Sequence, residues 1–152
     1  MVVPSVFKIT RVIKVPHSVM LKVVGDVEKY SQFVPYCKDS LVTERVGGVP
    51  SRVKLMVGFG AYNDSFDSLL TYRGNKIIAE AGDTAMFNRL ACTWTINPVA
   101  EDRCSAALDL EFSFANKLYN LASSQAGPTV AKSMIKAFSE RALVINGPTV
   151  QF

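Results

Sequence analysis

Apolar and polar residues alternate along most of the first 114 positions, a pattern typical of strands with one buried face. The alternation predicts strands at residues 5–15, 41–46, 51–59, 66–72, 76–81, 89–97 and 104–114. Gly47-Gly48 and Gly74-Asn75 stand at hairpin spacing between neighbouring strands. Residues 98–102, which begin with Pro98, are expected to form a loop. Short turns between successive strands indicate an antiparallel sheet.

Helical spacing replaces the alternation in residues 116–145, where the apolar side chains fall on one stripe: Ala131, Met134, Ile135, Phe138, Ala142 and Ile145. A helix of this length would run about 40 Å. A shorter helix is expected over residues 19–27, after Pro16 and with His17-Ser18 as its N-cap. The pattern predicts an α+β fold, a curved antiparallel sheet of about six to seven strands wrapped around a long C-terminal helix. We expect one domain spanning residues 1–152.

Composition narrows the possible functions. The chain has 152 residues, of which 49% are hydrophobic and 20% charged, and no apolar run approaches the roughly 18 residues that span a bilayer. The net charge is +4, but Lys and Arg are scattered singly, so DNA is not an expected partner. Cys37, Cys92 and Cys104 form no CxxC pair, and a reducing compartment is expected. Cys92 and Cys104 are interpreted as small buried apolar residues.

The sequence offers little for catalysis. No nucleophile and base stand together in the sequence, which gives a catalytic site little support. His17, the only histidine, is interpreted as a helix-entry residue. Neither a metal site nor a catalytic cofactor is predicted. The candidate inward positions are almost all hydrocarbon or aromatic, which favours a binding protein over an enzyme.

Four stretches of the chain, in order and in register, carry a family resemblance. They are Asp26-Val27-Glu28-Lys29-Tyr30 with Phe33-Val34-Pro35-Tyr36-Cys37 and Ser40; Val57-Gly58-Phe59 with Tyr62 and Phe66; Phe87, Leu90 and Trp94; and Phe112-x-Phe114-x-Asn116-Lys117-Leu118 with Met134, Ala137-Phe138 and Arg141-Ala142. Together they resemble the coenzyme Q-binding START-like family, over roughly residues 6–145. Two departures are Ala85-Met86-Phe87, where the family often has Gly-Pro-Phe, and Gly127-Pro128, which predicts a kink or a break in the long helix.

The resemblance implies a helix-grip fold with a hydrophobic tunnel that binds a polyprenyl quinone such as ubiquinone. It implies a non-catalytic chaperone that supports respiratory electron transport and ubiquinone biosynthesis. It also implies a mitochondrial location, peripheral on the matrix side of the inner membrane. Either the chain needs no targeting segment, or a leader was removed before residue 1. A bacterial branch of the family includes ribosome-association toxins.

The residues expected to line the ligand site are mostly apolar and aromatic: Tyr30, Phe33, Val34, Pro35, Tyr36, Leu55, Val57, Phe59, Phe66, Trp94, Leu110, Phe112, Met134 and Phe138. The headgroup is expected near residues 30–36. The tail is expected to run between Leu55, Val57, Trp94 and Leu110 of the sheet and the face of Met134 and Phe138 on the long helix. For Tyr30, Phe33, Tyr36 and Trp94, a plain core role is an equal alternative, and a single Met is more often filler than lining.

Asp26 and residues 118–122 also have two possible roles each. Asp26 either binds a headgroup or makes a local backbone hydrogen bond, and the local role is the one we expect. Residues 118–122 form an amphipathic flank that either contacts a membrane or packs on the sheet.

Two other functions stay open. One is an interaction protein bound to a respiratory complex or to a ribosomal particle such as the mitoribosome. The other is a cyclase or dehydratase, which would need polar groups that point into the cavity.

Overall fold

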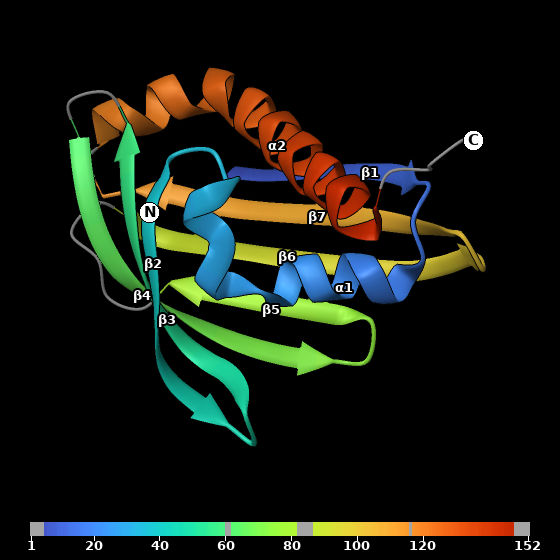
Figure 1. Cartoon of the computed structure of the whole chain (residues 1–152). Coiled ribbons are helices and arrows are strands. Elements are labelled where there is room, and N and C mark those ends of the chain that lie inside the picture. The colour runs from blue at the N-terminus through green and yellow to red at the C-terminus, as the bar shows by residue number, and fades with distance from the viewer. Residues whose placement is uncertain (1–4, 60–61, 82–86, 116, 148–152) are drawn as a thin grey trace.

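The computed structural model describes residues 5–59, 62–81, 87–115 and 117–147, with the backbone alone at residues 5, 59, 62, 114 and 117–127. Figure 1 shows the elements along the chain. They are β1 (Ser5–Ile13), α1 (His17–Gly25), the 3-10 helix η1 (Val27–Gln32), β2 (Cys37–Val46), β3 (Val49–Phe59), β4 (Tyr62–Arg73), β5 (Lys76–Ala81), β6 (Phe87–Ala100), β7 (Arg103–Phe114) and α2 (Lys117–Asn146).

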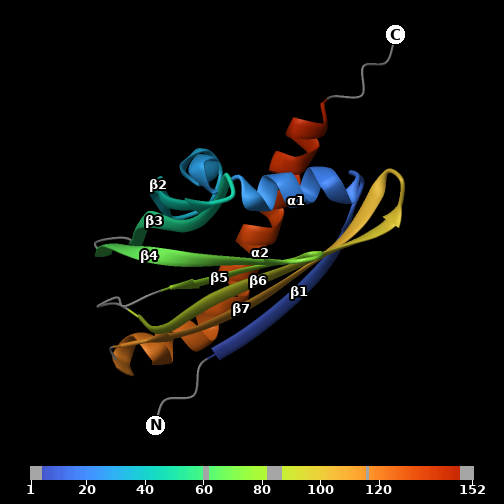
Figure 2. The ribbon, with the colours of Figure 1, turned by 90° about the horizontal axis from the view of Figure 1, so that it is seen from below.

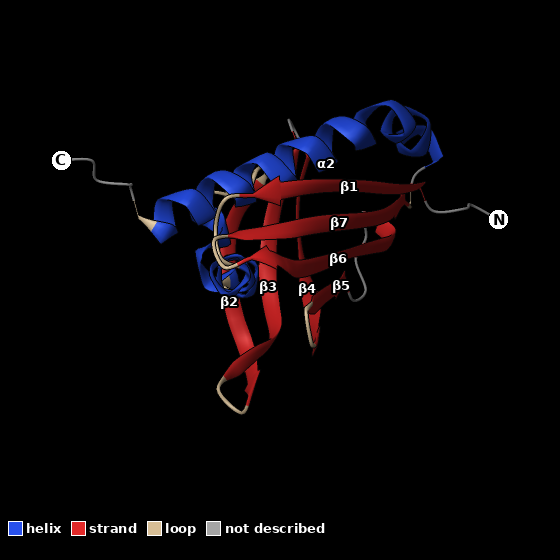
Figure 3. Cartoon of the chain, turned by 90° about the vertical axis from the view of Figure 1, so that its right-hand side faces the viewer, coloured by secondary structure: helices blue, strands red, loops and turns tan. Residues whose placement is uncertain are grey.

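The strands form one antiparallel sheet in the order β1-β7-β6-β5-β4-β3-β2. The strands after β1 follow the order of the chain as hairpins, and β1 pairs with the last of them, β7. The sheet curves, and α2 crosses the same face that α1 covers, as Figures 2 and 3 show from two sides. The predicted α+β fold, with a curved sheet around a long C-terminal helix, is confirmed.

Strands β2, β3, β4, β6 and β7 are longer than the alternation predicted, β5 has the predicted bounds, and β1 ends at Ile13, two residues before the predicted end. The predicted loop at 98–102 is wrong. β6 runs through Pro98 to Ala100, which leaves Glu101 and Asp102 as the turn. Beyond Thr95, β6 pairs with β7 but no longer with β5, and its register with β7 shifts between Pro98 and Ala100. Proline is tolerated at this position because the strand is an edge with a bulge there, so no neighbouring strand needs a hydrogen bond from the N–H that proline lacks.

Helix α1 begins at His17, but the predicted His17-Ser18 cap is wrong. The capping residue is Pro16, and no side chain makes a capping hydrogen bond. Pro16 supplies its carbonyl to the amides of Val19 and Met20 instead. The helix is rich in β-branched residues, and it is held by burial of Met20, Val23 and Val24.

Helix α2 is continuous across Pro128. Figure 1 shows that its first, orange part and its second, red part run in different directions, so the helix is kinked and not broken. The kink follows from the missing backbone N–H and the bulk of the Pro128 ring. The change of direction lets the two parts of α2 follow the curve of the sheet.

Candidate functional site between the sheet and the long helix

The face of the sheet covered by α2 is identified by strand register, because directly paired residues of antiparallel strands point to the same side. Trp94 of β6 packs with Phe138 of α2, so its face is the covered one. Trp94 pairs with Ile77, and two residues along, Cys92 pairs with Ala79. The register can be followed in the same way from β5 to β4 and from β4 to β3. It places Val53, Leu55 and Val57 of β3 on the covered face.

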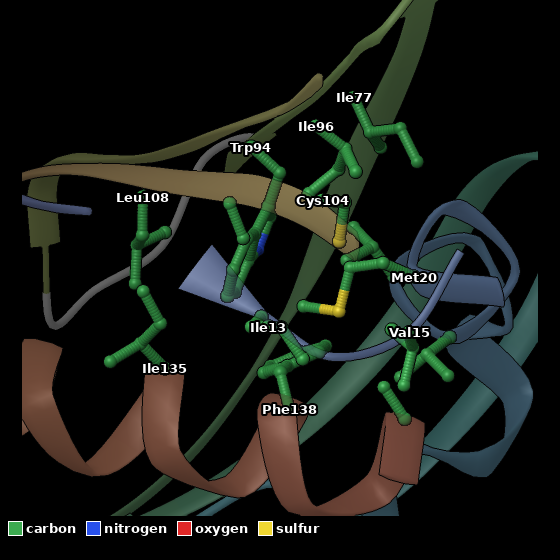
Figure 4. Close-up of a cluster of buried hydrophobic side chains, with 14 residues drawn as sticks. Ile13, Val15, Met20, Ile77, Trp94, Ile96, Cys104, Leu108, Ile135 and Phe138 are labelled. Atoms are coloured by element: carbon green, nitrogen blue, oxygen red, sulfur yellow. The ribbon is translucent and has the colours of Figure 1, made fainter. Parts of the chain in front are cut away.

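Half of this face is packed solid. Its buried cluster joins the sheet to α1 and to the second half of α2, and Figure 4 shows its side chains filling the space between them: Ile13, Val15, Met20, Val23, Val24, Ile77, Trp94, Ile96, Cys104, Ala106, Leu108, Ile135, Phe138 and Ala142. Cys104 is fully buried here, as the sequence predicted. Removal of this much apolar surface from water is the main stabilising contribution that the cluster makes.

An aromatic group made of Tyr30, Phe33, Trp94 and Phe138 forms the border of the solid half. The Phe138 ring is 5.3 Å from Tyr30, 5.0 Å from Phe33 and 4.7 Å from Trp94 between ring centroids. Phe138 is 1% exposed and Trp94 is 3% exposed. Rings at these distances are in van der Waals contact, so no ligand chain fits between Trp94 and Phe138. The aromatic group is therefore a wall at one end of the candidate site.

On the other side of this wall, the covered face is apolar but only partly buried. The side chains concerned are Leu55, Val57, Leu70, Ala79, Leu90, Cys92 and Met134. Leu90, Cys92 and Met134 pack on a smaller buried cluster of Leu110, Phe112 and Ala131. Accessible apolar surface on the covered face is the kind of surface that an apolar ligand binds.

Cys92 shows how apolar this region is. It lies on a central strand of the sheet, and burial raises the pKa of its thiol to about 12. The thiol is therefore neutral at physiological pH, and its surroundings are poor in water. The sequence predicted a buried residue here, whereas the side chain is only partly buried.

Ser68 and Asp64 are polar side chains on the covered face that the sequence reasoning missed. Ser68 is 3% exposed and pairs with Val53. Asp64 pairs with Val57, and its carboxylate accepts a hydrogen bond from the amide of Ser65 at 2.9 Å. The alternation of β4 could have found them, because both are an even number of residues away from Phe66.

Residues 27–36 close the site from the side of η1. The Tyr30 hydroxyl donates a hydrogen bond to the Val24 carbonyl, and burial raises the pKa of Tyr30 well above its ordinary value. Val34 and Pro35 are partly buried and Tyr36 is 42% exposed. Tyr36 has a φ of 67°, which is uncommon for a residue other than glycine, and its carbonyl accepts a hydrogen bond from the Gly58 amide at 3.0 Å.

The structure brings the predicted lining residues together on one side of the sheet, but in different roles. Leu55, Val57 and Met134 are partly buried on the accessible half. The buried residues Phe66, Leu110 and Phe112 belong to the same half, whereas Trp94 and Phe138 belong to the wall. Two predictions fall outside the described side chains, the role of Phe59 and the contact made by residues 118–122. The loop at Ala85-Met86 also lies outside the described residues. Ligand binding by any of these residues stays a prediction.

A small crevice lies outside the wall, between α1 and the end of α2. Its volume is about 10 Å³, room for about one water molecule, and it is lined by Lys22, Val23, Asp26, Phe33, Arg141 and Ile145. The carboxylate of Asp26 forms an ion pair with Lys29 at 3.9 Å, and the Asp26 carbonyl accepts a hydrogen bond from the Lys29 amide.

In the described part of the chain, no three His, Cys, Asp or Glu side chains are grouped to hold a metal ion. Over the same residues, no helix is both long and apolar enough to cross a bilayer.

Solved structures define the class of the fold. A START superfamily protein from Mycobacterium smegmatis matches with a TM-score of 0.85 over 92% of this chain and 98% of that chain, at 19% identity. The Zhui aromatase/cyclase of Streptomyces matches with a TM-score of 0.66 over 93% of this chain and 87% of the other, at 18% identity. The fold is therefore START-like, as the sequence predicted.

The sequence places the chain within that class. Residues 13–139 match the family described as polyketide cyclase/dehydrase and lipid transport. The mitochondrial coenzyme Q-binding protein of Schizosaccharomyces pombe is 30% identical over 91% of this chain and 87% of its own length, and that of Eremothecium gossypii is 34% identical over 86% and 69%. The ribosome association toxin of Escherichia coli is 29% identical over 89% and 86%. The chain belongs to the START-like polyketide cyclase/dehydrase and lipid transport family, and it is similar to the family's coenzyme Q-binding proteins.

Proposed function

We propose that this protein binds a polyprenyl quinone of the coenzyme Q type between its sheet and α2, and carries it without chemical change. The observation that supports the proposal most is the accessible half of the covered face, which is apolar, lies beneath α2 and ends at an aromatic wall. The names of the S. pombe and E. gossypii relatives, which describe coenzyme Q-binding proteins, supply the ligand class.

The ligand's orientation follows from the placement of polar groups. The quinone ring is assigned to the wall end, near Tyr30, whose hydroxyl donates a hydrogen bond to the Val24 carbonyl. The isoprenoid tail then runs away from Trp94 and Phe138, along Leu55 and its neighbours. The predicted passage of the tail between Trp94 and Phe138 is replaced by this route, because the two rings touch.

The biological role is part of the same proposal. The fungal relatives are named as mitochondrial, and we assign this chain to the mitochondrion, peripheral on the matrix side of the inner membrane, in support of respiration and ubiquinone synthesis. Two alternatives have an observation of their own. The toxin relative favours a ribosome-associated interaction protein, and Ser68 and Asp64 on the covered face, with the Zhui likeness, favour a cyclase.

A pair of neighbouring substitutions tests the binding site. Leu55 and Met56 are adjacent on β3 but point to opposite faces, and Met56 is 45% exposed on the outer one. The protein is incubated with quinone-loaded vesicles, separated from them, extracted with solvent and assayed by mass spectrometry. The wild type and the Met56→Trp variant are expected to retain quinone in a stoichiometric amount. The Leu55→Trp variant fills the site and is expected to lose it.

The outcomes separate the alternatives. A wild-type protein that takes up no quinone refutes the proposal, and RNA or ribosomal proteins recovered with it would favour the interaction protein. Equal uptake by Leu55→Trp and Met56→Trp refutes the location of the site. Circular dichroism of both variants shows whether the fold is retained.

A further inference from the structure

Residues 27–36, the cover segment, supply Tyr30 and Phe33 to the aromatic wall. In addition to Arg141, the segment is tied to the fold by the Glu28–Arg45 ion pair and by hydrogen bonds from the Ser40 hydroxyl to the Glu28 carbonyl, from the Tyr30 hydroxyl to the Val24 carbonyl and from the Gly58 amide to the Tyr36 carbonyl. The backbone hydrogen bonds that the segment makes within itself are local, from the Phe33 amide to the Tyr30 carbonyl and from the Val34 amide to the same carbonyl. A short 3-10 helix has poorer hydrogen-bond geometry than an α-helix and contributes little stability by itself. The segment therefore depends on side-chain contacts to keep its place.

The rings of the cover segment close the wall. Tyr30 and Phe33 pack edge to face against Phe138, whose other neighbour is Trp94. When the cover segment is in place, Phe138 and Trp94 are almost fully buried. If the segment moved outward, both rings would become accessible to solvent and the wall end of the site would open.

Arg141 connects the cover segment to α2 by two contacts. Its guanidinium donates a hydrogen bond from Nη2 to Oε1 of Gln32 at 3.0 Å. The same guanidinium lies over the Phe33 ring, with Cζ 5.3 Å from the ring centroid. Phe33 and Arg141 also line the small crevice between α1 and α2, so the cover segment is not packed continuously against the helices at this edge.

We propose that Arg141 is a positioning residue that holds the cover segment closed and thereby sets the rate at which an apolar ligand enters and leaves the site. The inference rests on the proposed quinone binding for its biological meaning, but the closure itself does not need a ligand. Both contacts of Arg141 are lost when the segment moves outward. They therefore stabilise the closed state relative to the open one, whether or not ligand is bound.

The test begins with the protein free of ligand. Trp94 is the only tryptophan and lies behind Phe138 in the wall, so quenching of its fluorescence by acrylamide reports opening of the cover segment. The Arg141→Met variant keeps an apolar stem but loses both polar contacts, and its quenching rate is expected to rise by about threefold to tenfold. The quenching rate of the Arg141→Lys variant is expected to lie between that of the wild type and that of Arg141→Met. Lys136→Met, on the exposed side of the same helix, is the matched control and is expected to match the wild type.

The second measurement is the rate of quinone transfer from loaded protein to acceptor vesicles. With Arg141→Met, entry and exit are expected to accelerate together, so that the rates change by about threefold to tenfold while the affinity changes little. A variant with a lower melting temperature but unchanged quenching and transfer rates would show that Arg141 is only structural, and would overturn the proposal. If the wild type binds no quinone, the proposed function fails, and the quenching experiment still decides the role of Arg141.

Discussion

Phe138 contacts every other ring of the aromatic wall. The loss in free energy of unfolding caused by Phe138→Ala measures how tightly these rings are packed. The side chain is 1% exposed and contacts the rings of Tyr30, Phe33 and Trp94. Truncation of a buried phenylalanine costs about 3–5 kcal/mol, and each aromatic pair contributes about 0.5–1.5 kcal/mol beyond its buried area. With three such pairs, we expect a loss at the upper end of that range, about 4–5 kcal/mol.

Urea unfolding measures this loss. A domain of this size has a stability of about 5–15 kcal/mol, so the variant should still fold if the wild-type stability exceeds about 7 kcal/mol, which the wild-type unfolding curve measures. With a slope of about 2 kcal/mol per molar urea, the unfolding midpoint should fall by about 2 M. Far-UV circular dichroism follows the whole fold, and Trp94 fluorescence follows the wall. Leu143→Ala, on the same helix but 48% exposed, is the control and should change stability by no more than about 0.5 kcal/mol.

A small effect would refute the reasoning. If Phe138→Ala cost less than about 2 kcal/mol, the ring would not be enclosed, and the interior would continue past Trp94 as one open space. The tail could then pass the position that we assign to the wall. Phe138→Leu, which keeps much of the volume but no ring, should lie between the wild type and Phe138→Ala.

Two further predictions concern a tight backbone approach and alkaline pH. A Cβ at Gly58 would overlap the Lys38 side chain, whose Nζ donates a hydrogen bond to Oδ1 of Asn63 at 2.7 Å. Gly58→Ala should therefore displace the Lys38 side chain. In that background, Lys38→Met should no longer change the free energy of unfolding. A double-mutant cycle by urea unfolding should give a coupling of about 0.5–1 kcal/mol, and a coupling of zero would contradict the contact. Burial raises the pKa of Cys92 to about 12 and that of Tyr30 well above 10, so above pH 9 the unfolded chain binds fewer protons than the folded one. Stability that is present below pH 9 should be lost between pH 9 and 12, by up to about 1.4 kcal/mol per pH unit for each group, and Cys92→Ala should flatten the decline.

The sequence predicted the sheet well where turn chemistry marks the ends of strands. β5 begins at Lys76, directly after the Gly74-Asn75 turn, and its bounds are those predicted. The end of β6 was missed because Pro98 ordinarily stops a strand, and only the tertiary pairing shows that its amide is not needed there. The start of β4 was missed for a different reason. Residues 62–65 are mostly polar, and they belong to the strand because they pair with the end of β3.

The candidate site was predicted in its composition more than in its geometry. Leu55, Val57 and Met134 were expected to line the site, and they lie on the accessible half. Sequence spacing gave no sign that Phe138 touches Trp94, because the contact joins a strand to a helix more than 40 residues away along the chain. The bond between Arg141 and Gln32, 109 residues apart, had no sequence signal at all.

Under the proposed function, the division of the covered face into a solid and an accessible half would explain how one small fold can both be stable and carry a lipid. Accessible apolar surface inside a fold is destabilising, because each unfilled space loses contacts that a packed core would make. In this chain the loss is offset next to the space itself, by a cluster that joins α1, α2 and the sheet behind Trp94. Under the proposed function, the wall between the halves would let ligand bind and leave the accessible half without disturbing the core. A carrier needs this separation. Removing the cargo's apolar surface from water is worth about 25 cal/mol per Å², but a bilayer provides much the same gain. The net free energy of transfer from bilayer to protein is therefore small, which permits release, and binding is possible only if it costs the fold little.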